Sequence, residues 1–183
     1  MIEVRIHGRG GQGAVTTGQI IAIASLYDNK YSQTFPHFGV ERRGAPVEAY
    51  VRIDKSFIDL RSEVYNPDVV LVLEPSLIHA VDVTKGLKHG GTVIVNTSKK
   101  ARELKIKGEF KVHTIDASSI AMKIFKRPIV NTPIIGAFSA ITKMVSIKSL
   151  QRAIDDKFAL TKGKQIAELN KKAVKEVYDI VKQ

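Results

Sequence analysis

Apolar and polar residues alternate at the start of the chain, and this period of two predicts a β-strand over residues 2–6. Glycines between 8 and 13 interrupt the alternation, and an apolar stretch with helical spacing follows from Gln12 to Tyr27. The opening therefore predicts a strand, a glycine-rich loop and a helix. Two further alternating segments, at 31–35 and 47–53, predict strands joined by a loop rich in proline, glycine and charge.

The middle of the chain contains shorter and more continuous apolar runs. Residues 69–73 are apolar throughout, as in a strand of a parallel sheet that is covered on both faces. Residues 75–76 suit the start of a short helix, and 92–96 and 111–115 predict two more strands. This alternation of strands and helices is typical of an α/β fold.

From about Thr132 onward, apolar residues recur at helical spacing. They predict a helix over 134–145, a second at 147–158 behind a Ser146 cap, and a last amphipathic helix over 166–180. The apolar stripe of the last helix either closes the core or docks onto a partner. We predict that residues 1–183 form a single three-layer α/β domain with a mostly parallel central sheet and a helical C-terminal region.

Composition narrows the class of protein. The chain has 183 residues, and no apolar run approaches the roughly 18 residues needed to span a bilayer. Its first residues show no basic leader followed by a long apolar segment, so we expect a cytoplasmic protein without membrane contact. There is no cysteine, which excludes disulfides and the thiolate ligands that iron–sulfur clusters normally require. The net charge of +11 suits an anionic partner of any kind, but scattered basic residues are also typical of an ordinary solvated surface.

The glycine-rich loop is the first candidate site. Glycines between a strand and a helix let backbone N–H groups approach a ligand, and the helix dipole favours an anion there. Arg9 adds a charged fork suited to phosphate. The alternative is that the glycines only make a tight turn. A nucleotide dehydrogenase would also place an acidic residue at the end of its second strand, whereas Asp28 precedes that strand.

The second candidate is the charged loop between the strands predicted at 31–35 and 47–53. Aromatic and arginine side chains are enriched at interface hot spots, and arginines can also bind a phosphate or a carboxylate. An internal carboxylate–arginine pair that braces a surface loop is the competing interpretation. The residues expected to form this interface or loop are Phe35, Phe38, Glu41, Arg42, Arg43 and Gly44.

The histidines show neither metal-ligand spacing nor a serine or cysteine partner in a known motif. No catalytic residue and no metal site are expected in this chain. Two of them adjoin the candidate segments and are kept only as weak candidates: His7 and His37. The others are His79, His89 and His113.

Four segments together resemble the gamma subunits of 2-oxoacid:ferredoxin oxidoreductases, most closely those of the pyruvate synthase branch. They occur in order over nearly the whole chain: VRIHGRGGQGAVTTGQIIAIA, SQTFPHFGVERRGAPVEAYVRI, VVLVLEPSL and NTPIIGAF. Glycine-rich openings are common, but GRGGQG followed by FGVERRGAP is typical of this family.

The resemblance implies a non-catalytic subunit of an enzyme that oxidises pyruvate and coenzyme A to acetyl-CoA and CO2 and reduces ferredoxin. It implies alpha, beta and delta partner subunits that hold thiamine diphosphate, Mg and the iron–sulfur clusters, with nothing bound covalently to this chain. It also implies that coenzyme A binds at or near this subunit. The residues carried over to that contact are Arg9, Gly10, Gly11, Gln12, Gly13, Asn131 and Thr132.

Other classes remain open at this point. A gamma subunit of a related enzyme that acts on 2-oxoisovalerate or another 2-oxoacid would look alike, because substrate choice should lie mostly in other subunits. A freestanding NAD-dependent dehydrogenase is the rival enzyme. A nucleic-acid-binding protein is suggested only by the charge, and the chain lacks a helix-turn-helix signature, an RNA-binding aromatic motif and zinc ligands, so no nucleic acid is expected.

Overall fold

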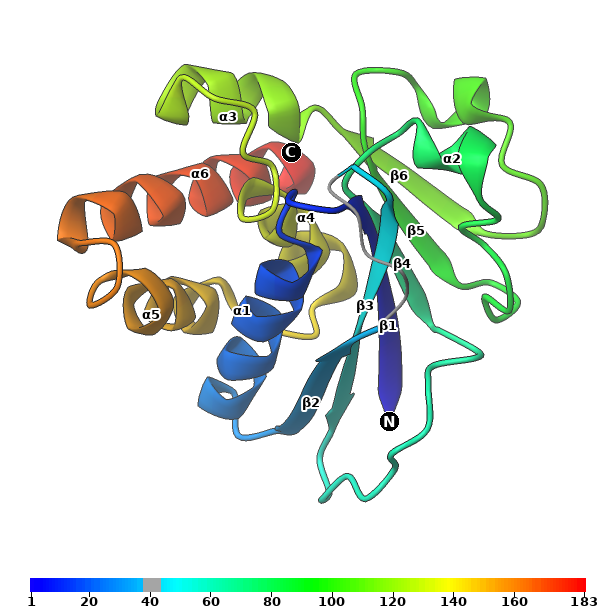
Figure 1. Ribbon diagram of the computed structural model, residues 1–183, viewed down its shortest axis with the longest axis horizontal. Coiled ribbons are helices and arrows are strands. Elements are labelled where there is room, and N and C mark those ends of the chain that lie inside the picture. Colours follow the sequence, from blue (N-terminus) through cyan, green and yellow to red (C-terminus); the bar gives the residue numbers. More distant parts are fainter. Residues whose placement is uncertain (38–43) are drawn as a thin grey trace.

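The computed structural model describes residues 1–37 and 44–183, and it shows a six-stranded sheet with helices on both faces (Figure 1). The strands are β1 (Ile2–Arg9), β2 (Tyr31–Pro36), β3 (Pro46–Asp54), β4 (Val69–Val72), β5 (Thr92–Asn96) and β6 (Lys111–Ile115). The helices are α1 (Ala14–Tyr27), α2 (Leu77–Ala80), the 3-10 helix η1 (Ala101–Leu104), α3 (Ala117–Phe125), α4 (Pro133–Thr142), α5 (Ile147–Phe158) and α6 (Lys164–Lys182).

The strand order is β2-β3-β1-β4-β5-β6, and this order confirms the predicted mostly parallel sheet. Strands β1, β4, β5 and β6 pair in parallel, and β3 runs antiparallel to both β1 and β2. Because β1 and β4 are adjacent but the chain leaves them toward opposite edges of the sheet, their carboxyl ends form a topological switch point. Open α/β sheets bind ligands in the crevice at such a point.

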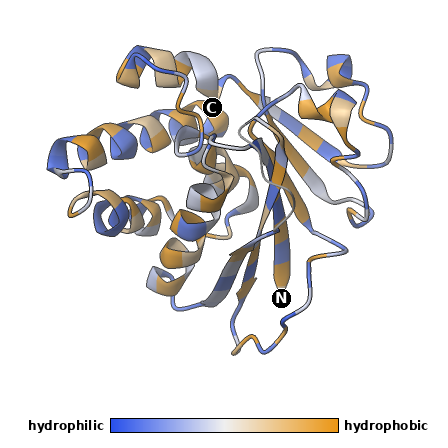
Figure 2. Ribbon diagram, viewed as in Figure 1, coloured by the Kyte–Doolittle hydropathy of each residue, from blue (hydrophilic) through white to orange (hydrophobic). Residues whose placement is uncertain are grey.

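On the first face of the sheet α1 and α4 pack against the strands, α5 packs on α1, and α3 and α6 pack on α4. The core of this face includes Val4, Ile6, Val51 and Leu71 from the strands and Phe138 from α4. In Figure 2 hydrophobic and hydrophilic bands alternate along α6, as expected for a helix with one buried stripe. A smaller apolar cluster covers the second face of β4 and β5 beneath α2.

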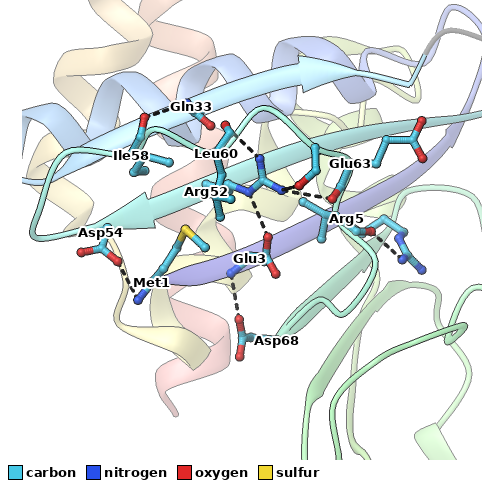
Figure 3. Close-up of polar contacts among 12 residues, drawn as sticks. Met1, Glu3, Arg5, Gln33, Arg52, Asp54, Ile58, Leu60, Glu63 and Asp68 are labelled. Atoms are coloured by element: carbon cyan, nitrogen blue, oxygen red, sulfur yellow. Dashed lines mark hydrogen bonds and ion pairs between the residues drawn. The ribbon is translucent and has the colours of Figure 1, made fainter.

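The second face of β1 and β3 is charged instead of apolar (Figure 3). Arg52 is only 1% exposed, its Nε lies 2.9 Å from Glu3 Oε1, and its Nη2 donates to the Glu63 carbonyl at 3.1 Å. Arg5 donates to the carbonyls of Lys85 and Val64 at 2.6 and 3.0 Å. Two arginines from neighbouring strands therefore fix irregular segments whose backbone carbonyls would otherwise lack a partner.

Most predicted elements are confirmed, with differences at the ends. The strands predicted at 92–96 and 111–115 have those bounds in the structure, whereas the first helix begins at Ala14 and the helix predicted to reach Val145 ends at Thr142. The predicted cap is confirmed, because the Ser146 hydroxyl accepts the Ser149 N–H. Helix α3 was not predicted. No helix in the described ranges is both long and apolar enough to cross a membrane.

We predict that Arg52→Met lowers the free energy of unfolding by about 3–5 kcal/mol, because it leaves the Glu3 carboxylate without its buried partner. Urea denaturation of the full chain measures this loss. The matched control is Lys88→Met, which removes the 2.8 Å pair with Asp68 from a side chain that is 45% exposed and should cost less than about 1 kcal/mol. Equal losses in the two variants would contradict the assigned role of Arg52.

Candidate functional site: a glycine loop and an adjoining pocket

The loop between β1 and α1 is fixed by the side chain of Gln12. Its Oε1 accepts the Arg9 N–H at 2.8 Å, and its Nε2 donates to Glu74 Oε2 at 3.0 Å. The Gln12 N–H also donates to the Arg9 carbonyl at 2.9 Å. These bonds close a tight turn and join it to the residues that follow β4. The loop thus lies at the carboxyl edge of β1 and β4, where the topology favours a ligand.

Glycine is required at position 13 for two separate reasons. Gly13 has φ +85°, a conformation that L side chains rarely adopt, and a Cβ at this position would lie 2.8 Å from Asn131 Nδ2. Thr17 strengthens the same junction, since its hydroxyl donates to the Asn131 carbonyl at 2.9 Å. The predicted residues Gly13 and Asn131, 118 positions apart by their numbers, are therefore neighbours.

The N-terminus of α1 opens beside this contact. Helix geometry leaves its first-turn N–H groups without intrahelical partners, and its N-cap is a glycine with no side chain to bind them. No acidic residue lies in the first turn of α1. The partial positive charge of the helix end is therefore not neutralised by a carboxylate from its own first turn.

A pocket of about 410 Å³ adjoins the glycine loop. Its walls come from the loop, from the segment leading into α4 and from α5 and α6, and Figure 1 shows how these elements meet beside α1. The lining residues are Gly11, Gln12, Gly13, Thr16, Pro128, Ile129, Asn131, Thr132, Phe158, Lys162, Ile166 and Asn170. Five of the seven residues predicted to contact a cofactor therefore lie in its wall: Gly11, Gln12, Gly13, Asn131 and Thr132.

The two other predicted contacts, Arg9 and Gly10, are outside this lining. The Arg9 guanidinium donates to the Gly44 carbonyl at 3.0 Å and to Ser76 Oγ at 2.9 Å. The Gly10 N–H donates to the Ala45 carbonyl at 2.8 Å, and Gly44 donates to the Gly10 carbonyl at 3.2 Å. Both residues thus connect the glycine loop to the end of the second predicted segment, which places the two segments at one edge of the sheet as expected.

Sequence reasoning missed Glu74, which follows the buried strand β4 at the same edge. Partial burial acts to raise the pKa of the Glu74 carboxyl, but hydrogen bonds from Gln12 and Ser76 and the nearby Arg9 outweigh it and lower the pKa overall. The carboxylate thus stays ionised and holds the loop through Gln12. Its position directly after an apolar run was the signal that could have identified it.

The second predicted segment is described only at its two ends. The Phe35 ring lies 5.3 Å from the Tyr50 ring and 5.4 Å from the Arg52 guanidinium carbon, so it packs within the fold. Gly44 has φ +85° and accepts the Arg9 bond. The predicted residues Phe38, Glu41, Arg42 and Arg43 lie outside the described residues.

Asp28, the acidic residue weighed for an NAD ribose, has a structural role. Its carboxylate accepts the Ser146 N–H at 2.6 Å and the Ser149 hydroxyl at 2.6 Å. It thereby ties the end of α1 to the start of α5. This structural role accounts for an acidic residue about 20 positions after the glycine loop, so its presence there does not indicate a dinucleotide site.

His7 belongs to β1 and its side chain is buried, with Nδ1 3.5 Å from Glu48 Oε1 of β3. Burial lowers the pKa of the imidazole to about 4, an effect that the Glu48 carboxylate opposes and Arg5 increases. His37 Nδ1 lies 3.1 Å from Glu63 Oε1 on the same side of the sheet. Among the described residues, no three His, Asp or Glu side chains gather as metal ligands would.

We predict a pH dependence of stability that belongs to His7. Its folded-state pKa lies below the ordinary 6.5, so the unfolded chain binds this proton first. The contribution of His7 to the free energy of unfolding is complete above about pH 6.5. It is lost as the pH falls toward about 4, by on the order of 3 kcal/mol. Urea midpoints across this range should show a shallower slope for His7→Gln than for the wild type. Identical slopes for His7→Gln and the wild type would refute the assignment.

We predict that Gly13→Ala destabilises the fold more than Gly11→Ala. Both positions have positive φ, which costs about 1–2 kcal/mol for a residue with a Cβ. A Cβ at position 11 meets nothing within 4 Å, whereas one at position 13 collides with Asn131, which should add about 1–3 kcal/mol. Thermal unfolding of the two variants measures the difference. Equal destabilisation would show that the contact with Asn131 does not constrain the loop.

Comparison with known proteins agrees with the predicted resemblance. Residues 3–180 match the family model described as Pyruvate ferredoxin/flavodoxin oxidoreductase. The chain is 50% identical to pyruvate synthase subunit PorC of Methanocaldococcus jannaschii, over 98% of this chain and 96% of the relative. It is also 50% identical, with the same coverage, to the pyruvate/ketoisovalerate oxidoreductases common subunit gamma of Pyrococcus furiosus.

The fold agrees with a solved relative as well. The crystal structure of pyruvate oxidoreductase subunit PORC from Thermotoga maritima superposes with a TM-score of 0.84 at 35% identity, over 97% of this chain and 95% of that one. The family model, the similar sequences and the solved structure all indicate the same family. The chain therefore belongs to the pyruvate ferredoxin/flavodoxin oxidoreductase family, as a gamma-type subunit of a multi-subunit oxidoreductase.

Proposed function

We propose that the chain is the gamma subunit of a pyruvate:ferredoxin oxidoreductase and that its glycine-loop pocket holds part of coenzyme A. The complete enzyme converts pyruvate and coenzyme A to acetyl-CoA and CO2 and passes two electrons to ferredoxin. In this assignment alpha, beta and delta subunits carry thiamine diphosphate, Mg and the iron–sulfur clusters. The present chain supplies coenzyme A contacts and an assembly surface, and the isolated chain has no activity.

The observation that carries the proposal is the pocket beside the N-terminus of α1. Coenzyme A is a polyanion, and a helix N-terminus with free amides favours bound phosphate. The described residues of the pocket wall include Lys162 and no carboxylate. Its volume of about 410 Å³ is at the small end of ligand sites, which suits a portion of coenzyme A better than the whole molecule.

The division of labour follows from residue chemistry. The chain has no cysteine, so the cysteine-ligated clusters that pass electrons to ferredoxin belong to other subunits. The histidines described above are engaged with carboxylates or buried, which does not suit a proton-transfer role. The residues that line the glycine-loop pocket are suited to binding and positioning a co-substrate.

A 2-oxoisovalerate-oxidising complex is the second candidate, and one observation favours it. The relative from Pyrococcus furiosus is named as a common gamma subunit of pyruvate and ketoisovalerate oxidoreductases. The name of this relative describes one gamma subunit shared by two oxidoreductases. The acyl substrate would then depend on the alpha and beta subunits that assemble with this chain.

We predict that an affinity tag on this chain recovers a complex containing thiamine diphosphate and iron–sulfur clusters from its native lysate. The recovered complex should reduce ferredoxin or a viologen only when both a 2-oxoacid and coenzyme A are present, and pyruvate should be a better substrate than 2-oxoisovalerate. The matched control is the same preparation without coenzyme A. A chain that purifies alone contradicts the subunit assignment, and a preference for 2-oxoisovalerate replaces the first candidate with the second.

A further inference from the structure

The glycine-loop pocket, the one that adjoins the loop between β1 and α1, differs from three other surface pockets of the described residues in the charges of its lining residues. The others each combine cations with carboxylates, for example Asp59 with Arg61, Asp82 with Lys105, and Glu168 with Lys171. Among the described residues that line the glycine-loop pocket, only Lys162 is charged. Lys162 forms no ion pair with any carboxylate in residues 1–37 and 44–183. The pocket is therefore positively charged in a way that the other pockets are not.

Lys162 is positioned by the end of α5. Its ammonium lies 5.4 Å from the centroid of the Phe158 ring, and its backbone N–H donates to the Phe158 carbonyl at 2.8 Å. Phe158 itself is buried. A cation stacked on a buried ring loses less conformational freedom on binding an anion than a free surface lysine does.

Two helices of ten or more residues begin at this pocket, α1 after Gly13 and α4 after Thr132. Their contributions differ. Pro133 has no N–H, and the amides of Ile134 and Ile135 already donate to backbone carbonyls, so α4 adds mainly its dipole. Helix α1 adds both its dipole and the free amides of its first turn.

Asn131 supplies an independent observation that points to a ligand. The residue is 8% exposed, its side chain lies against Gly13, and it lines the pocket. Its carboxamide makes no hydrogen bond within the described part of the chain, although it is not among the side-chain atoms that are sealed from solvent. The carboxamide is therefore open to the pocket and has both donor and acceptor atoms available for a ligand there.

We propose that this pocket binds a terminal phosphate, a phosphomonoester, and that Lys162 and Asn131 determine its specificity. The inference rests on the proposed function, because the phosphomonoester of coenzyme A is the 3′-phosphate of its adenosine. A terminal phosphate carries nearly two negative charges and three acceptor oxygens. Three separate donors line the pocket to receive them: the α1 amides, the Asn131 carboxamide and the Lys162 ammonium. A bridging diphosphate group offers only one charge and two free oxygens at each phosphorus.

The test is steady-state kinetics of the assembled complex with coenzyme A and with dephospho-coenzyme A, which lacks only the 3′-phosphate. The wild type should show a KM for coenzyme A about tenfold below that for dephospho-coenzyme A, the effect of one charge-assisted contact. Lys162→Gln should raise the KM for coenzyme A about tenfold and leave the KM for dephospho-coenzyme A unchanged.

Asn131→Asp is a second variant, whose side chain has the same shape and size as the wild-type one. A carboxylate beside the N-terminus of α1 should not reduce the unfolding temperature, because the helix dipole favours it. It should nevertheless repel the phosphate and raise the KM for coenzyme A by at least about tenfold. The matched control is Lys164→Gln, which removes a lysine two positions further along that does not line the pocket, and its KM values should equal those of the wild type.

The outcomes separate this inference from the proposed function. Equal KM values for the two coenzymes in the wild type, or equal increases for both in Lys162→Gln, would overturn the phosphomonoester assignment while leaving the coenzyme A subunit intact. An unchanged KM for coenzyme A in both Lys162→Gln and Asn131→Asp would also overturn it. If the chain enters no coenzyme A-dependent complex, the proposed function fails, and the inference fails with it.

Discussion

The side chain of Asn131 occupies the space where a Cβ of residue 13 would lie, and the geometry of the site depends on this contact. It brings the first turn of α1 against the segment that leads into α4, so that both helix N-termini lie at one pocket. Gly13 permits the approach because it combines a positive φ with the absence of a side chain. The Thr17 bond to the Asn131 carbonyl holds the junction from within α1.

The sheet supports this junction because its two faces are built differently. Helices α1 and α4 pack on the apolar first face, α5 and α6 pack on those two helices, and the loop after α5 carries Lys162 to the pocket. On the second face Arg5 and Arg52 hold irregular segments by hydrogen bonds to backbone carbonyls (Figure 3). At the edge between these faces, Gln12 and Glu74 join the loops that follow β1 and β4. The glycine loop is thus fixed before any ligand arrives, which reduces the entropic cost of binding.

Local patterns in the sequence predicted most of the helices and strands. The contacts between distant segments could not be read from such patterns. Strands β5 and β6 were placed correctly because their residues form short runs bounded by turn signals, whereas α3 was missed because only Ala117, Ile120 and Ala121 are buried in it. The family motifs placed Asn131 beside the glycine loop. No local pattern shows that Arg9 is bound to Gly44 and Ser76, or that Lys162 faces the loop from the far end of the chain, because these are properties of the folded topology.

We infer that the first turn of α1 and the segment before α4 bind coenzyme A together. Hydrogen–deuterium exchange of the assembled complex, with and without coenzyme A, measures this directly. Coenzyme A binding should slow amide exchange in peptides covering residues 10–17 and 127–133 and leave a peptide covering 56–65 unchanged. Protection that appears elsewhere in the complex, with unchanged exchange at 10–17, would contradict it.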